Sequence, residues 1–214
     1  AFFVDMRAKG VTARPIRQMN NETGFAEVFF EDVMIDDSQR LGAVDDGWAT
    51  ALTMLSYERM AIGLEMPTGF EELWEYCSAL ETEAGPALED PRIQMRLAEF
   101  EASARGLGIF TLQAMGRFAK GEPPGPEASI VKLAAGRMMQ EIAAFALDLQ
   151  AEAGILVGKD EPAFAGRFQG MCLRAPATRI EGGSDQILRN IIAERVLGMP
   201  ADVRVDKDRS FDAI

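Results

Sequence analysis

The feature that most constrains the fold is a change of hydrophobic pattern at Gly47. From there to about residue 198, apolar residues recur every three or four positions, as on one face of a helix. Loops rich in glycine and proline divide this part into predicted helices. They span residues 46–80, 91–119, 127–153, 162–174 and 185–198, with boundaries that are approximate. The first is expected to be kinked near Pro67. The pattern predicts an antiparallel helical bundle.

The first 43 residues have a different composition. AFFVDM, VTARPI and FAEVFFEDVMI are rich in β-branched and aromatic residues, and turn signals at Lys9-Gly10 and residues 20–24 separate them. These stretches predict β structure. The chain opens without Met inside the first stretch, so we interpret it as a piece of a longer protein. The predicted organisation is mainly α, with a partial β domain over 1–43, a four-helix-bundle-like domain over 44–200 and a tail over 201–214.

Composition excludes several classes of function. The formal net charge of −12 argues against nucleic acid as a partner, because phosphates would be repelled. The absence of histidine excludes His-based catalytic triads and His metal sites, and no metal is expected. Cys77 and Cys172 are far apart in sequence and give neither a metal-binding spacing nor a disulfide framework. The lack of a disulfide framework favours a reducing compartment. No apolar run has the length of a membrane span.

A single carboxylate interrupts the apolar stripe of the first predicted helix. Ala51, Leu55, Glu58 and Ile62 follow one another at spacings of 4, 3 and 4, so they share one helical face. A buried carboxylate is costly unless it is paired. Two interpretations remain open from this pattern: Glu58 lies at the edge of the stripe and pairs with a basic neighbour, or it is a functional group in an apolar site.

The second candidate site is the loop before the last predicted helix. Here Glu181 is followed by Gly182, Gly183 and Ser184, and Ser184 is a favoured residue type for a helix N-cap. Glycines at a helix start let a ligand approach backbone NH groups, although an ordinary tight turn has the same composition. Glu181 is therefore either a solvated loop carboxylate or part of a site.

Taken in order, these segments resemble acyl-CoA dehydrogenases. FFVDMRAKGVTARPIRQ, FAEVFFEDVMI and RLGAVDDGWATALTMLSYERMAIG look like the family's middle β domain running into its C-terminal helical domain. PGPEASIVKLAAGRMMQEIAAFALDL resembles the third long helix of that domain, and EGGSDQILRNIIAERVLGMP resembles its closing helix. The resemblance covers nearly the whole chain but not the family's N-terminal helical domain, so this piece alone is expected to be inactive.

The resemblance implies α,β-dehydrogenation of an acyl-CoA thioester, in which a glutamate removes the α-proton and a hydride passes to N5 of FAD. Many members place this glutamate in the loop before the closing helix, which here is the terminal loop of residues 181–184. The matching position is Gly182, one residue after Glu181. Others place it on the first helix of the C-terminal domain in a Glu-Arg pair, which here is Glu58-Arg59. The resemblance therefore implies Glu58 as the base, with Glu181 as the alternative.

The resemblance also implies binding residues and partners. Those expected on the substrate side are Tyr57, Arg59, Glu181 and Gly182, and those expected on the FAD side are Gly183, Ser184, Asp185 and Gln186. Expected partners are an acyl-CoA, an electron-transfer flavoprotein as electron acceptor and further subunits in a homo- or hetero-oligomer. The expected location is the bacterial cytoplasm, with the mitochondrial matrix as the alternative.

Two departures from the family pattern point to a competing function. An Arg-x-Gln-Phe-Gly motif that reaches a neighbouring subunit's FAD is absent between residues 64 and 100, and residues 150–154 replace a Gly-Gly turn. They resemble bacterial enzymes in which some subunits pair with a different chain. The alternative is thus a catalytically reduced, structural subunit of a heteromeric dehydrogenase. A third possibility keeps the fold but uses the flavin for other chemistry.

Overall fold

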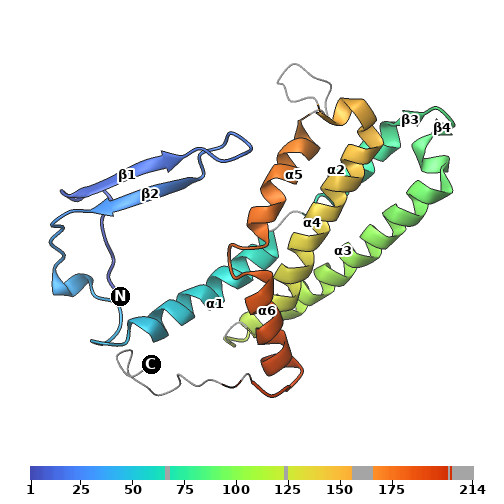
Figure 1. Ribbon diagram of the computed structural model, residues 1–214. Coiled ribbons are helices and arrows are strands. Elements are labelled where there is room, and N and C mark those ends of the chain that lie inside the picture. The colour runs from blue at the N-terminus through green and yellow to red at the C-terminus, as the bar shows by residue number, and fades with distance from the viewer. Residues whose placement is uncertain (66–67, 123–124, 156–165, 202, 204–214) are drawn as a thin grey trace.

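The chain folds into a β hairpin beside a bundle of helices (Figure 1). The computed structural model describes all residues except 66–67, 123–124, 156–165, 202 and 204–214, and the side chains of residues 59–65 are likewise not described. The kink expected near Pro67, the first residues of the helix expected over 162–174 and most of the tail expected over 201–214 lie outside the described residues. The mainly α prediction, with a helical bundle preceded by a short β segment, is confirmed.

The N-terminal β segment is a single hairpin. β1 (Val11–Ile16) pairs antiparallel with β2 (Phe25–Phe30), with Val11 opposite Phe30 and Ile16 opposite Phe25. The strand expected over AFFVDM is wrong, because in that stretch only Phe2 forms an isolated bridge, to Arg40. Nearly every residue of both strands is exposed, since no second layer covers either face in the described chain.

The helix expected over residues 46–80 is two helices. α1 (Gly47–Glu65) and α2 (Phe70–Ala79) are separated at Gly69, whose φ of 83° lies in the left-handed region. A Cβ at Gly69 would lie 2.6 Å from Met171 Cε, so the turn needs glycine for both its backbone angle and its packing. The single-helix prediction was wrong because it located only a kink at Pro67.

The helices predicted over residues 91–119 and 127–153 agree closely with the structure. α3 (Pro91–Phe118) begins with Asp90 as N-cap and a proline in its first turn. The hydrogen bond from the Arg92 side chain, followed by that from the Arg92 backbone NH, holds the pKa of Asp90 at about 2. α4 (Ala128–Gln150) continues into a 3₁₀ turn at Ala151–Ile155. A short hairpin of β3 (Glu81–Thr82) and β4 (Gly85–Pro86), which joins α2 to α3, was not expected.

The C-terminal helices end differently from the prediction. α5 (Arg167–Thr178) extends beyond the expected residue 174 and contains Pro176 in its last turn. α6 (Asp185–Ile191) is followed by a π-helical turn at Ile192–Val196, so the helix expected over 185–198 widens at its end. Within α6, Leu188 is fully buried.

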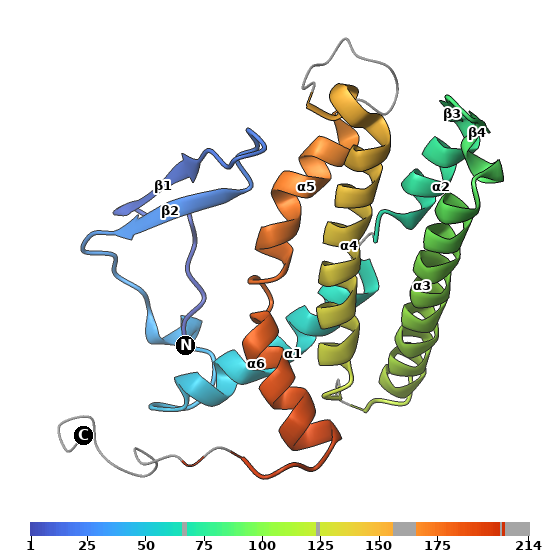
Figure 2. The ribbon, with the colours of Figure 1, turned by 45° about the vertical axis from the view of Figure 1, so that its right-hand side comes forward.

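The core lies between α2, α3, α4 and α5, with α4 at its centre (Figure 2). α4 contributes most to the interior because apolar side chains recur on its inward face at three- and four-residue spacing. The completely buried side chains of the core include Leu73 on α2, Ile142 on α4 and Phe168 on α5. The bundle thereby fixes the N-terminal end of α4, whose Lys132 contacts the loop between α5 and α6.

The two cysteines differ in burial, which predicts different reactivity. Cys77 on α2 is 1% exposed, and desolvation raises the pKa of its thiol to about 11, whereas Cys172 on α5 is half-buried. At pH 8 we expect a thiol reagent to modify Cys172 at least about 10²-fold faster than Cys77, because the thiolate is the nucleophile. Timed labelling followed by mass spectrometry measures both rates, and Cys172→Ser isolates Cys77.

The same shift predicts a pH dependence of stability. The folded-state pKa of Cys77 is raised above its ordinary value of 9.0. Its contribution to the free energy of unfolding is therefore fully present below about pH 9 and is lost as pH rises through about 11. Cys77→Val should flatten the alkaline limb of a plot of melting temperature against pH, and an unchanged limb would contradict this assignment.

Candidate functional site

Glu58 is exposed on α1, so the described chain does not enclose it in an apolar site. Ala51 and Leu55 of the predicted stripe are half-buried, whereas the side chain of Ile62 lies outside the described residues. Within the described part of the chain, Glu58 has no ion-pair partner. The carboxylate thus interrupts a stripe that is itself only half-buried at Ala51 and Leu55, and the basic partner of the first interpretation is not found among the described residues. An exposed carboxylate is free to meet a substrate.

Tyr57 lies next to Glu58 and is anchored by an aromatic contact. Its ring packs edge-on against Phe118 at the end of α3, with the ring centroids 6.4 Å apart, and 45% of Tyr57 stays exposed. Such an edge-to-face arrangement is a favourable one for aromatic rings. The side chain of Arg59 lies outside the described residues, so the Glu58-Arg59 pair keeps its sequence-based assignment.

The terminal loop has the backbone geometry that its glycines predict. Gly182 has a φ of 62° and Gly183 a φ of 109°, both in the region that favours glycine. A Cβ on Gly183 would point at the buried Leu188, 3.2 Å from Cδ2. A side chain at Gly183 would therefore point into α6 and not to the surface.

The three residues at the start of α6 lie in different environments. Ser184 is the N-cap, and its hydroxyl accepts a hydrogen bond from the NH of Ile187 at 3.4 Å. Asp185, expected on the cofactor side, is 5% exposed and pairs with Arg179 at 2.6 Å, so its carboxylate stabilises the loop from within. Gln186 is exposed and available to a ligand.

Glu181 is held by an arginine. Arg174 Nη2 on α5 donates to both carboxylate oxygens, at 2.6 and 2.9 Å, and both side chains are about 30% exposed. The guanidinium of Arg174 also lies 6.0 Å from the ring centroid of Phe25 on β2. Glu181 therefore has a structural partner, and Arg174 links the terminal loop to the hairpin.

Lys132 on α4 is a site residue that the sequence analysis missed. Its side chain is fully buried, and its Nζ donates a hydrogen bond of 2.7 Å to the carbonyl oxygen of Gly183. Burial lowers the pKa of this ammonium below its usual range, whereas the charges of Asp185 and Glu181 raise it. The sequence did contain a signal for this burial, because Lys132 lies four and seven residues before the buried Gly136 and Met139 and so shares their face of the helix.

The terminal loop presents unpaired donors. Among the described residues, the NH groups of Gly182, Gly183 and Ser184 have no acceptor. Within the same part of the chain, Arg174 Nη1 is buried without a hydrogen-bond partner. Backbone NH groups beside glycines bind phosphate and carbonyl oxygens well, because no side chain blocks their approach. These residues therefore suit a polyanionic or carbonyl-bearing ligand.

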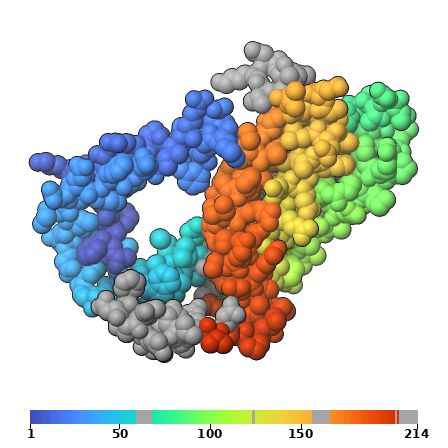
Figure 3. All heavy atoms as spheres, in the orientation of Figure 1, coloured from blue at the N-terminus to red at the C-terminus, as the bar shows by residue number. Residues whose placement is uncertain are grey.

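The space beside these donors is open. Figure 3 shows an opening bounded by the hairpin, α1 and the α5–α6 region. In Figures 1 and 2, α1 passes close to the start of α6, so Glu58 and the terminal loop belong to neighbouring elements. Among the described residues, however, Glu58 forms no hydrogen bond with the loop. A ligand that uses both must span the distance between them.

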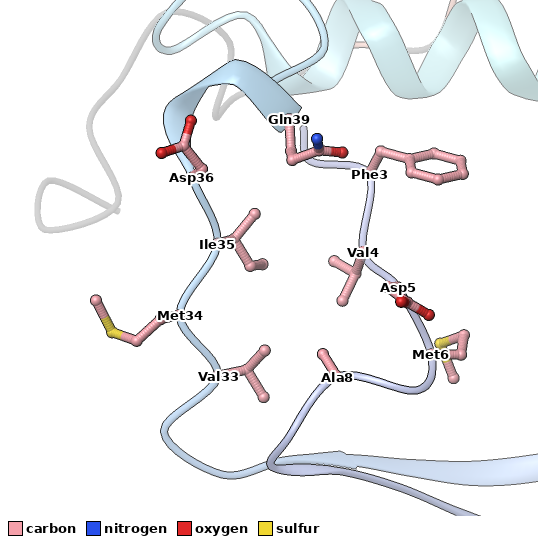
Figure 4. A pocket seen from close by; sticks show the side chains of 10 residues that line it. All are labelled: Phe3, Val4, Asp5, Met6, Ala8, Val33, Met34, Ile35, Asp36 and Gln39. Atoms are coloured by element: carbon pink, nitrogen blue, oxygen red, sulfur yellow. The ribbon is translucent and has the colours of Figure 1, made fainter.

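A separate pocket of about 590 Å³ lies in the N-terminal segment (Figure 4). Val4, Val33 and Ile35 point into it, whereas Met34 and Asp36 point away. Its lining contains acidic but no basic side chains. The pocket therefore does not suit the phosphates of a nucleotide or of coenzyme A.

Residues 45–197 match the family model of the acyl-CoA dehydrogenase C-terminal domain. The chain belongs to the acyl-CoA dehydrogenase family. It is 32% identical over 201 residues to the acyl-CoA dehydrogenase IpdE1 of Mycolicibacterium smegmatis, a match that covers 94% of this chain and 49% of that protein. It is 30% identical over 201 residues to the acyl-CoA dehydrogenase FadE34 of Mycobacterium tuberculosis, covering 93% of this chain and 26% of that one.

Solved structures share the fold. The ChsE4-ChsE5 complex from Mycobacterium tuberculosis superposes with a TM-score of 0.77 at 21% identity, covering 94% of this chain and 53% of the matched chain. The Tcur3481-Tcur3483 steroid acyl-CoA dehydrogenase gives a TM-score of 0.77 at 20% identity, covering 94% and 52%. The chain thus spans about half the length of these proteins. Among the described residues, no helix is long and apolar enough to cross a membrane.

Proposed function

We propose that this chain forms the base-bearing part of an FAD-dependent acyl-CoA dehydrogenase, with Glu58 as the catalytic base. The observation that carries the proposal is the contrast between the two candidate glutamates. Glu181 is occupied on both oxygens by Arg174, whereas Glu58 is exposed and has no ion-pair partner in the described part of the chain. Family membership over residues 45–197, a range that includes both glutamates, supports the same chemistry.

In this proposal Glu58 accepts the α-proton of an acyl-CoA thioester through its carboxylate. FAD, when bound, accepts the β-hydrogen as hydride. General-base catalysis of this kind typically contributes about 10²–10⁴-fold to the rate, provided that the base lies within hydrogen-bond reach of the proton. The chain's own task is to hold Glu58 on α1 and to orient the thioester against it.

The remaining site residues are proposed to have the roles that the family resemblance implies. Tyr57 and Arg59 flank the base on the substrate side, while Glu181 and Gly182 form the loop edge that faces the thioester. Gly183, Ser184 and Gln186 offer donors to the flavin, whereas Asp185 acts indirectly by fixing Arg179 and the start of α6. An electron-transfer flavoprotein would reoxidise the cofactor.

The visible spectrum of the purified complete protein tests this proposal. We expect bound FAD whose visible absorbance bleaches when an acyl-CoA is added without oxygen. A coloured protein that no acyl-CoA bleaches would contradict the dehydrogenase assignment while keeping the flavoprotein one.

A structural subunit of a heteromeric dehydrogenase is the second candidate. Two observations favour it. The family's Arg-x-Gln-Phe-Gly motif is absent between residues 64 and 100, and two structures with a similar fold pair two components, ChsE4 with ChsE5 and Tcur3481 with Tcur3483. In this case the chain's helices support a partner subunit that carries the complete site. A colourless preparation that acquires FAD only with a co-expressed partner would support this function.

A further inference from the structure

The buried lysine of α4 has no role in the chemistry proposed above. The Lys132 side chain is fully buried, with Val131 and Ala135 buried beside it on the same helix. Burying an amine in an apolar environment is costly unless it gains a partner. The partner is the carbonyl oxygen of Gly183, 2.7 Å away and 51 residues further along the chain.

The charges around Lys132 show that it is not needed for charge balance. Glu181 is already paired with Arg174, and Asp185 with Arg179. Burial lowers the pKa of Lys132, while the charges of Asp185 and Glu181 raise it and that of Arg179 lowers it. Lys132 is thus an additional cation beside two ion pairs, so its removal leaves each acid with its arginine, while Asp185 Oδ1 is buried without a hydrogen-bond partner in the described chain.

The hydrogen bond fixes the orientation of one peptide group. In a trans peptide the C=O and N–H point in opposite directions, and no peptide bond in the described chain is cis. Because the Gly183 carbonyl points inward to Nζ, the NH of Ser184 points outward from α4. That NH has no acceptor among the described residues. The cation also polarises the peptide group, which strengthens its NH as a donor.

From this geometry we infer that Lys132 is a positioning residue that holds the Gly183–Ser184 peptide with its NH turned towards the ligand. The inference rests on the proposed function for the nature of that ligand, which is an electron-rich oxygen of FAD or of the acyl-CoA thioester. Lys132 touches neither ligand and acts only through the loop. Without it, the glycine-rich loop can rotate this peptide, because Gly183 tolerates many backbone angles.

Lys132→Met in the complete protein tests the inference, because methionine has a similar length and donates no hydrogen bond. In the ligand-free protein we expect hydrogen exchange of peptides covering residues 179–188 to accelerate at least about tenfold, while α3 exchanges as before. The dissociation constant for FAD should rise at least about tenfold. Lys120→Met, at an exposed lysine, is the matched control and should change neither quantity.

The outcomes separate this inference from the proposed function. Unchanged loop exchange in Lys132→Met overturns the positioning role, as does faster exchange spread evenly over the bundle with unaltered FAD affinity, which indicates a structural role only. If the unaltered protein binds neither FAD nor acyl-CoA, the proposed function fails, and loop exchange still decides whether Lys132 holds the peptide. Lys132→Gln, which keeps a polar end group, replaces the methionine variant in both measurements if that variant does not fold.

Discussion

Replacing Glu58 with glutamine in the complete protein is expected to lower turnover of an acyl-CoA at least about 10²-fold, with little loss of stability. Glutamine has nearly the same size but cannot accept the α-proton. Glu58 is exposed and has no ion-pair partner in the described chain, so its replacement should change the free energy of unfolding by no more than about 0.5 kcal/mol. Anaerobic flavin reduction measures the chemical step, and thermal unfolding measures stability.

Glu181→Gln is the matched control for that variant. It weakens a partly exposed ion pair with Arg174, so we expect a stability loss of about 1 kcal/mol or less. Turnover should fall by less than about tenfold, because only the orientation of the loop changes. Glu58→Gln is therefore expected to lose more activity, whereas Glu181→Gln is expected to lose more stability. The reverse ranking, with Glu181→Gln inactive and Glu58→Gln active, would move the base to the terminal loop.

Much of the fold could be predicted because the helical periodicity agrees with the residues that begin and end helices. α3 begins where Asp90 and Pro91 indicate a cap and a first turn, and α6 begins directly after its N-cap, Ser184. The break between α1 and α2 was missed because it depends on Gly69 meeting Met171, a residue of α5. The AFFVDM stretch has strand-forming residues, but strand formation needs a hydrogen-bonding partner that local sequence does not specify.

The candidate site was less predictable because burial depends on tertiary packing. The periodicity of α1 left open whether Glu58 lies at the edge of the stripe or in an apolar site, and the described bundle leaves the carboxylate exposed. Lys132 had the corresponding signal on a helix whose inward face is buried, and there the polar residue is enclosed. Its partner is a backbone carbonyl, which any residue could supply, so no side-chain pattern identifies the contact.

Gly183→Ala is expected to lower both the stability of the complete protein and its gain in stability on binding FAD. Alanine at a φ of 109° is strained, and its Cβ would lie 3.2 Å from the buried Leu188. Together these effects should cost about 1–3 kcal/mol, which lowers the melting temperature of a chain of this size by about 3–10 °C. The loop relieves the strain by rotating the peptides on either side, which misdirects the Ser184 NH.

Gly121→Ala separates strain from ligand binding. Gly121 also has a left-handed φ, 78°, but no atom lies within 4 Å of its added Cβ, and it is far along the chain from the terminal loop. We expect Gly121→Ala to lower the melting temperature and to keep the full FAD-dependent rise, which follows from the dissociation constant. In Gly183→Ala the FAD-dependent rise should shrink. If both variants keep the full rise, the glycines of the terminal loop serve only to start α6, and the flavin donors must lie elsewhere in the protein.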